Sequence, residues 1–149
     1  MGHGAWSQKP GTWDKEKGMI IINWGKDMND FRFKDLQIWN DAIGISELLF
    51  DIADLSDERR YYKFAEQLRA ASMSITNNIA EGSGSFSDRE FANFLNVSRR
   101  SVYECANILY LFERRNIINE STLSEMLGKL VVISKMITNF RKTLLRIEK

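Results

Sequence analysis

The sequence is poor in the residues that most reactive sites and tight turns require. One proline and nine glycines in 149 residues argue against collagen-like, proline-rich and many-turned all-β architectures. The single cysteine, Cys105, excludes an internal disulfide and is consistent with a reducing cytosol. The single histidine, His3, argues against zinc sites, paired Glu-x-x-His di-iron sites and histidine-activated nucleophiles. We therefore expect a protein that is not an enzyme and that holds neither a metal nor a cofactor.

Long apolar runs are also missing. No stretch approaches the ~18–20 apolar residues of a transmembrane helix, so no membrane partner is expected. The first residues lack the basic-then-apolar order of a signal peptide. Hydrophobic residues make up 44% of the chain and charged residues 28%, which is typical of one globular domain of this length. These features predict a cytoplasmic location.

The net charge is only +1, but the two signs are segregated along the chain. Residues 28–58 contain two basic and eight acidic side chains, a net −6. Residues 59–149 contain 15 basic and nine acidic side chains, a net +6. Such segregation predicts a basic face on a nearly neutral protein. The alternative is that lysines and arginines gather near helix C-termini because the helix dipole favours them there.

The first 30 residues differ from the rest of the chain. They hold the only proline, five of the nine glycines and three of the four tryptophans, without a helical period. We expect residues 1–30 to form an irregular N-terminal extension, in which residues 20–22 either form a short extended piece or adhere to the domain.

Beyond this extension, apolar residues recur at alternating spacings of three and four, which is the period of an amphipathic α-helix. Four such segments follow: one of about 22 residues from residue 33, then about 58–81, about 88–114, and one that begins after Asn119. Short connections force successive helices to alternate in direction. Residues 31–149 are therefore predicted to fold as an all-α, up-down-up-down antiparallel four-helix bundle. The predicted core stripes are Ile38, Ala42, Ile45, Leu49 and Ile52; Tyr61, Ala65, Leu68, Ser72, Ile75 and Ile79; Phe91, Leu95, Ser98, Val102, Cys105, Leu109 and Phe112; and Met126, Leu130, Ile133, Ile137, Phe140, Leu144 and Ile147.

Turn signals mark the ends of the first two segments. Residues 54–58 (D-L-S-D-E) are predicted to end the first helix and to supply N-caps for the second. Gly82 is predicted to end the second helix at the position where a positive φ is common.

Capping boxes mark the starts of the other two segments. Ser87 and Glu90 fit the Ser-x-x-Glu pattern, and Phe86 and Phe91 stand at the positions of a hydrophobic staple. A second box is predicted at residues 122–125 (T-L-S-E).

The first and last segments carry more apolar surface than one bundle core needs. Exposed apolar patches of that breadth are usually covered by another chain. We therefore expect a closed homo-oligomer rather than a monomer.

Residues 67–84 (Q-L-R-A-A-S-M-S-I-T-N-N-I-A-E-G-S-G) closely resemble a family signature that reads roughly Q-L-R-R-A-x-x-S-I-P-x-N-I-A-E-G-S-G. Residues 33–39 and 90–95 resemble the opening of that family and the start of its third helix. The family is a bacterial group of small four-helix bundles named for proteins encoded in intervening sequences of 23S ribosomal RNA genes. The resemblance covers about residues 31–147, and residues 78–84 carry its most specific part. Thr76 departs from the family's proline, and Arg100-Ser101 from its Gly-Ser.

The family is similar in fold to the accessory proteins of diversity-generating retroelements, which are basic pentameric bundles that bind a reverse transcriptase and nucleic acid. The resemblance therefore implies a homo-oligomer, with five copies the expected number, and an RNA or ribonucleoprotein partner. It implies no catalytic residues. The motif residues that it singles out are Asn78, Glu81, Gly82 and Gly84.

Two interpretations of these motif residues stand. In the first, they form a polar site beside the glycine-containing loop. In the second, Asn78 and Glu81 satisfy backbone or neighbouring hydrogen-bond donors at the end of the bundle. We favour the second. Glu81 and Glu104 are expected to be partly buried and to pair with Arg69 or Arg100.

Cations, amides and one tyrosine share a face of the third segment, opposite its apolar stripe. Such a face suits phosphate contacts combined with base stacking, although a merely solvated face is the alternative. The candidate nucleic-acid-binding residues are Arg89, Arg99, Arg100, Tyr103, Arg114, Arg115, Lys135, Arg141, Lys142 and Arg146. The leading hypothesis is a non-enzymatic oligomer that binds RNA through its basic surface. The second is a protein–protein scaffold, such as an accessory subunit of a retroelement reverse transcriptase.

Overall fold

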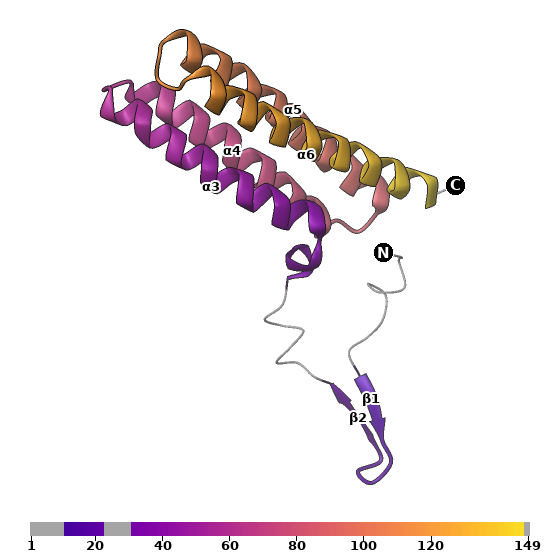
Figure 1. The fold of residues 1–149 in the computed structure, drawn as a ribbon. Helices are drawn as coiled ribbons and strands as arrows, with labels where there is room; N and C mark the ends of the chain where they lie inside the picture. The colour runs from indigo at the N-terminus through magenta and orange to yellow at the C-terminus, as the bar shows by residue number, and fades with distance from the viewer. Residues whose placement is uncertain (1–10, 23–30, 148–149) are drawn as a thin grey trace.

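Four α-helices follow one another in the computed structural model, which describes residues 11–22 and 31–147 (Figure 1). They are α3 (Gln37–Glu58), α4 (Tyr62–Ser83), α5 (Asp88–Arg114) and α6 (Glu120–Ile147). A short 3-10 helix, η1 (Arg32–Asp35), precedes them. The fold class predicted from the sequence, an all-α antiparallel four-helix bundle, is confirmed.

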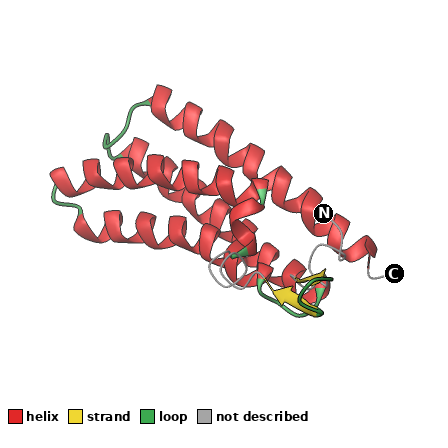
Figure 2. Cartoon of the chain, turned by 90° about the horizontal axis from the view of Figure 1, so that it is seen from below, coloured by secondary structure: helices red, strands yellow, loops and turns green. Residues whose placement is uncertain are grey.

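Successive helices run antiparallel and pack against each other: α3 with α4, α4 with α5, and α5 with α6 (Figure 1). The α3–α4 and α5–α6 connections lie at one end of the bundle, and the α4–α5 connection lies at the other end. The view from below, in Figure 2, shows the long helices running side by side. Neighbours in sequence pack most closely, and α3 and α6 close the bundle through a smaller contact.

The core lies along the four predicted stripes. Every hydrophobic residue of the first and third stripes is buried, including Cys105. In the last stripe Phe140 is half-buried and packs edge-on against Phe91, with ring centroids 5.3 Å apart. The side chain of Ile147 lies outside the described residues. Burying one such stripe per helix provides the main driving force for folding, at about 25 cal/mol per Å² of apolar surface.

The N-terminal extension is more regular than expected. Residues 11–22 form an antiparallel hairpin of β1 (Gly11–Asp14) and β2 (Met19–Ile22), so residues 20–22 take the extended form, the first of the two alternatives. The Asp14 carboxylate accepts hydrogen bonds from the amides of Glu16 and Lys17, and Gly18 has a φ of 62°. These contacts stabilise the turn, and for this reason an irregular chain was the wrong expectation here. The rest of the predicted extension, residues 1–10 and 23–30, lies outside the described residues.

The first helix ends at Glu58, the last residue of the predicted turn signal, but residues 54–57 are helical rather than a turn. Asp54 and Asp57 both accept hydrogen bonds from Arg69 of α4, at 2.6 Å, so these carboxylates bind a neighbouring helix instead of capping one. The chain reverses after them at Arg60, whose φ is 64°. The start of α4 at Tyr61 has no side-chain cap, which contradicts the predicted N-caps.

Gly82 does not end α4 with a positive φ. It is buried in the last turn of α4, and the helix ends at Ser83 with Gly84 as its C-cap, whose φ is −86°. The glycine is needed for a different reason, close packing. A Cβ at Gly82 would lie 2.7 Å from both Phe91 Cδ1 and Phe94 Cβ of α5.

The capping predictions for the later helices are partly confirmed. The Ser87 hydroxyl accepts from the Glu90 amide at 3.1 Å, as predicted. The staple is wrong, because the Phe86 side chain is fully exposed while Phe91 is buried. The start of α6 after Asn119 is confirmed, but Asn119 itself is the cap: its Oδ1 accepts from the Thr122 amide at 2.8 Å. Thr122 lies within the helix and was wrongly assigned this role.

Candidate functional site

A groove of about 570 Å³ runs between α5 and α6, and we call it the α5–α6 groove. Its walls come from four residues of α5 and eight of α6. The lining residues are Arg99, Val102, Tyr103, Ala106, Leu127, Leu130, Val131, Ser134, Lys135, Thr138, Asn139 and Lys142. Four of them are candidate nucleic-acid-binding residues from the sequence, so the fold brings Arg99, Tyr103, Lys135 and Lys142 together.

Arg99 and Tyr103 form a pair on the α5 wall because four residues separate them, which places both on one face of the helix. The Arg99 Nη2 atom donates to the Tyr103 hydroxyl at 3.1 Å, and the guanidinium lies 4.9 Å from the ring centroid. The Arg99 Nε atom is buried and has no hydrogen-bond partner among the described residues. A buried donor without an acceptor is costly, so this site favours a ligand or water that accepts from it.

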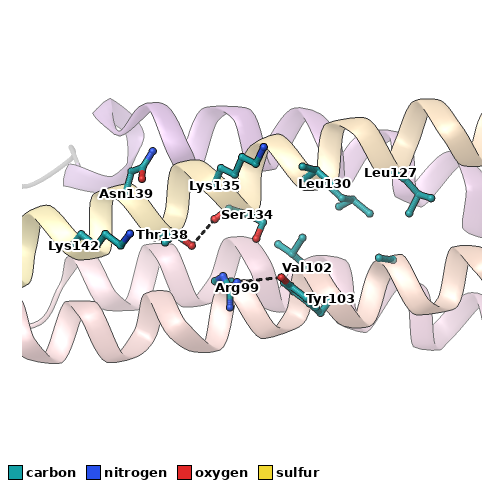
Figure 3. Close-up of a pocket in the computed structure, with 12 residues that line it drawn as sticks. Arg99, Val102, Tyr103, Leu127, Leu130, Ser134, Lys135, Thr138, Asn139 and Lys142 are labelled. Carbon is teal, nitrogen blue, oxygen red and sulfur yellow. Dashed lines mark hydrogen bonds between the residues drawn. The ribbon is translucent and has the colours of Figure 1, made fainter.

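The groove has a polar end and an apolar end (Figure 3). Asn139 and Lys142 lie at one end, Lys135 and Ser134 near the middle, and Leu127 and Leu130 at the other end. Among the described residues, the lining contains three cations and no carboxylate. An apolar wall beside unpaired cations suits a ligand that has both flat apolar surface and negative charge.

The other six candidate residues do not line this groove. The Arg141 side chain forms a hydrogen bond within the bundle, because its Nε donates to the Ala92 carbonyl of α5 at 3.1 Å. Arg89, Arg100 and Arg146 are exposed outside the groove. Arg114 is exposed at the C-terminal end of α5.

Arg115 belongs to a separate cluster at the end that holds the α3–α4 and α5–α6 connections. It donates to the Tyr61 hydroxyl at 3.2 Å, and both Arg115 and Arg59 lie within 6 Å of the Tyr61 ring centroid. The hydrogen bond from Arg115 lowers the pKa of Tyr61, and the nearby charges add to this effect. Arg59 also donates to the Asn116 carbonyl at 2.9 Å. Sequence reasoning missed Arg59, since no periodicity links two connections that are 57 residues apart.

Sequence reasoning also missed the polar residues of the α6 wall. Ser134, Thr138 and Asn139 line the groove beside Lys135 and Lys142. The available signal was the spacing of Val131, Lys135, Thr138 and Lys142, which follow one another at four, three and four residues along a second face of the helix.

The motif residues of α4 have mainly structural surroundings. Asn78 Nδ2 donates to the Ser74 carbonyl at 2.7 Å, and the Ser74 hydroxyl lies 2.7 Å from that of Ser101 on α5. This network favours the structural interpretation of Asn78. Glu81 and Glu104 are exposed, so their expected burial is wrong. The expected pairing of Glu81 with Arg69 is wrong too, because Arg69 pairs with Asp54 and Asp57.

The next two features concern residues 11–22 and 31–147. No group of three or more histidine, cysteine, aspartate or glutamate side chains in these ranges is arranged to hold a metal ion. Within the same ranges, no helix combines the length and the apolarity needed to cross a membrane.

Residues 34–139 match the family described as 23S rRNA-intervening sequence protein. The chain belongs to this family. The match spans all of α3, α4 and α5 and most of α6, so the family assignment inferred from residues 67–84 is confirmed. None of the curated proteins matches the chain.

A solved structure supports the fold of this family member. A protein of unknown function from the S23 ribosomal protein family of Bacteroides thetaiotaomicron VPI-5482 is similar to it, with a TM-score of 0.67. The two sequences are 19% identical, and the similarity covers 70% of this chain and 98% of the other. At this identity the likeness extends to the fold alone.

Proposed function

We propose that this protein is a non-enzymatic RNA-associated bundle that binds nucleic acid through the α5–α6 groove. The observation that carries the proposal is the meeting of Arg99, Lys135 and Lys142 around Tyr103 in one groove lined by no carboxylate. Cations neutralise phosphates and release counterions, while an exposed aromatic ring provides a surface on which a base stacks. Tyr103 is 58% exposed and is therefore accessible to a base.

The proposed binding depends on charge and shape rather than on base sequence. The groove offers flexible lysines and a single ring, not a set of paired donors and acceptors that would read base edges. We therefore expect binding to structured and single-stranded RNA with a strong dependence on salt. Each lysine that contacts a phosphate contributes about one unit to the slope of log affinity against log salt.

RNA binding by the nuclease-treated full chain tests this proposal. We expect fluorescence anisotropy with a labelled structured RNA to show binding at low salt. The double substitution Lys135→Ala/Lys142→Ala should weaken binding and lower the salt slope by about two. Tyr103→Ala should weaken binding by about 1–3 kcal/mol with little change in slope, because it removes stacking rather than charge.

The matched control is Lys63→Ala/Lys129→Ala, which removes two exposed lysines that do not line the groove. It should leave affinity nearly unchanged. An equal loss in the control pair, or no binding of the unmodified chain even at low salt, would contradict the proposal.

A scaffold function is the second candidate, and one observation favours it. Tyr103, Tyr110 and Val131 are each more than half exposed on α5 and α6, and aromatic residues are enriched at protein interfaces. The proposed partner is an enzyme such as a retroelement reverse transcriptase, as the family resemblance implies. Co-purification with the product of the adjacent gene after nuclease digestion, combined with no affinity for RNA, would favour this function over the first.

Self-association is part of either function, and we propose a homo-oligomer. The apolar residues left exposed on the first and last helices support it, among them Leu48 and Leu55 on α3 and Val131 and Val132 on α6. The expected number of five copies rests on the family resemblance. Native mass spectrometry measures this number directly.

A further inference from the structure

One face of α3 combines acidic and apolar side chains in two neighbouring rows, and we call it the acidic stripe. Glu47, Asp51, Asp54 and Glu58 follow at spacings of four, three and four residues, which is one row along a helix. Beside them lie Gly44 and the side chains of Leu48 and Leu55, which are 39% and 40% exposed. An exposed face of this kind is well suited to contact another molecule.

Most of the carboxylates of the acidic stripe are not used within the fold. Asp54 pairs with Arg69 at 2.6 Å. Glu47, Asp51 and Glu58 are exposed, and among the described residues no cation forms an ion pair with them. The other charges near this face are Lys129 and Glu125 of α6, which with Asp41 line the shallow groove between α3 and α6.

The α5–α6 groove has the opposite charge and a matching length. Its cations Arg99, Lys135 and Lys142 likewise form no ion pair among the described residues. From Leu127 to Lys142 its α6 wall is about 22 Å long, and the acidic stripe from Gly44 to Glu58 is about 21 Å long at 1.5 Å per residue.

The charges are also spaced alike. Seven residues separate Asp51 from Glu58, and seven separate Lys135 from Lys142, a rise of about 10.5 Å in each helix. With Asp51 opposite Lys135 and Glu58 opposite Lys142, Leu48 falls beside the apolar end of the groove.

We propose that the acidic stripe of one copy docks into the α5–α6 groove of a second copy. The stripe and the groove belong to different helices, so each copy contributes one of each and the contact is heterologous, in the sense that repeats head to tail. Side chains of opposite charge, which form no ion pair among the described residues of one copy, pair across the contact, and Leu48 covers part of the apolar end of the groove. The groove is also the proposed RNA site, so a second copy and RNA compete for it. This competition rests on the proposed function, whereas the docking itself does not.

Reversing the charge of each surface tests the docking. The two variants are Asp51→Lys/Glu58→Lys and Lys135→Glu/Lys142→Glu, all at exposed positions. Sedimentation velocity of the nuclease-treated full chains, at low salt and about 10 µM, should show that the unmodified chain assembles and that each variant alone does not, because like charges then face each other. An equimolar mixture of the two variants should assemble again, since each reversed surface meets its reversed complement.

Circular dichroism of each variant separates loss of assembly from loss of fold. The control Glu66→Lys/Glu104→Lys makes the same change in charge at exposed positions outside both surfaces, and it should assemble like the unmodified chain. A monomeric unmodified chain overturns the docking. So does a folded groove variant that assembles normally, or a mixture of folded variants that remains monomeric.

Adding a 20-nucleotide oligouridylate to the assembled chain tests the competition. We expect the assemblies to shift toward smaller protein–RNA complexes, and we expect Asp51→Lys/Glu58→Lys to bind the RNA at least as tightly as the unmodified chain. RNA that binds without changing the assembly overturns the competition. A complete absence of RNA binding contradicts the proposed function and the competition together, while the mixture of variants still decides the docking.

Discussion

At the scale of single residues, packing at Gly82 limits how closely α4 and α5 approach. The nearest atoms to an added Cβ belong to Phe91 and Phe94, and the Phe91 side chain is only 1% exposed. A buried ring of this size has little room to move aside. The glycine of the family motif therefore has a packing role in this chain.

We expect Gly82→Ala to destabilise the protein by about 1–3 kcal/mol, because the overpacked methyl group displaces the two rings. The control is Gly128→Ala, where an added Cβ has nothing within 4 Å. This control should stabilise the fold by about 0.5–1 kcal/mol, since alanine has the higher helix propensity. Urea denaturation measures both changes. A Gly82→Ala protein as stable as the Gly128→Ala protein would contradict the packing argument.

The buried thiol of Cys105 gives a prediction for pH dependence. Burial raises the pKa of Cys105 from its ordinary 9.0 to about 12, and the charge of Glu104 adds to the increase. The unfolded chain loses the thiol proton near pH 9 and the folded chain only near pH 12. The contribution of this group to the free energy of unfolding is therefore intact below pH 9 and decreases as the pH rises toward 12, by at most about 1.4 kcal/mol per pH unit.

Urea denaturation at several pH values between 8 and about 11 measures this decrease, and Cys105→Ala should remove that part of the pH dependence. Because the thiolate is the reactive form, the thiol of the native protein should also resist aromatic disulfide reagents at pH 8 and react after unfolding. Rapid modification of the native protein would show that the thiol is neither buried nor protonated as the structure indicates.

At the scale of helices, the interiors were predictable from the sequence and the ends were less so. The stripe from Phe91 to Phe112 is buried as predicted, because one repeating contact with the core fixes it. The end of α3 depends instead on Arg69, which lies 12 residues beyond Asp57 and keeps the acidic turn signal helical. Such a tertiary contact overrides the local turn signal, and the sequence of one helix alone does not predict the contact.

At the start of α5, the Ser87 cap predicted from the sequence forms, whereas the predicted staple of Phe86 does not. Ser87→Ala should destabilise the protein by about 1 kcal/mol, because the Glu90 amide loses its acceptor. Phe86→Ala should change the free energy of unfolding by less than about 0.5 kcal/mol, because this ring contributes no staple and is fully exposed. Chemical denaturation with circular dichroism checks both. A loss at Phe86 equal to the loss at Ser87 would indicate that the staple forms in solution.

At the scale of the whole molecule, the candidate site was half predictable. The sequence identified Arg99, Tyr103, Lys135 and Lys142 among ten candidates, because cations and an aromatic ring stand out beside an apolar stripe. It did not separate these four from Arg141, whose side chain turns to the Ala92 carbonyl. Which cations share a groove depends on how α5 and α6 rotate against each other, and that rotation is set by the packing of the complete bundle.

The division of the chain at about residue 30 is a prediction about the whole molecule that a truncation tests. Every residue of the described hydrophobic core lies at or beyond Leu36, and the half-buried Phe33 is the first to pack against it. A segment with no residue in the described core is expected to contribute little to the stability of that core. We therefore expect residues 31–149 alone to keep the helical circular dichroism of the full chain and to melt within a few degrees of it. Removal of residues 1–35, which deletes η1 and with it Phe33, is the matched control and should lower the melting temperature. If both truncations destabilised the bundle equally, the first 30 residues would belong to the folded domain and the division would be wrong.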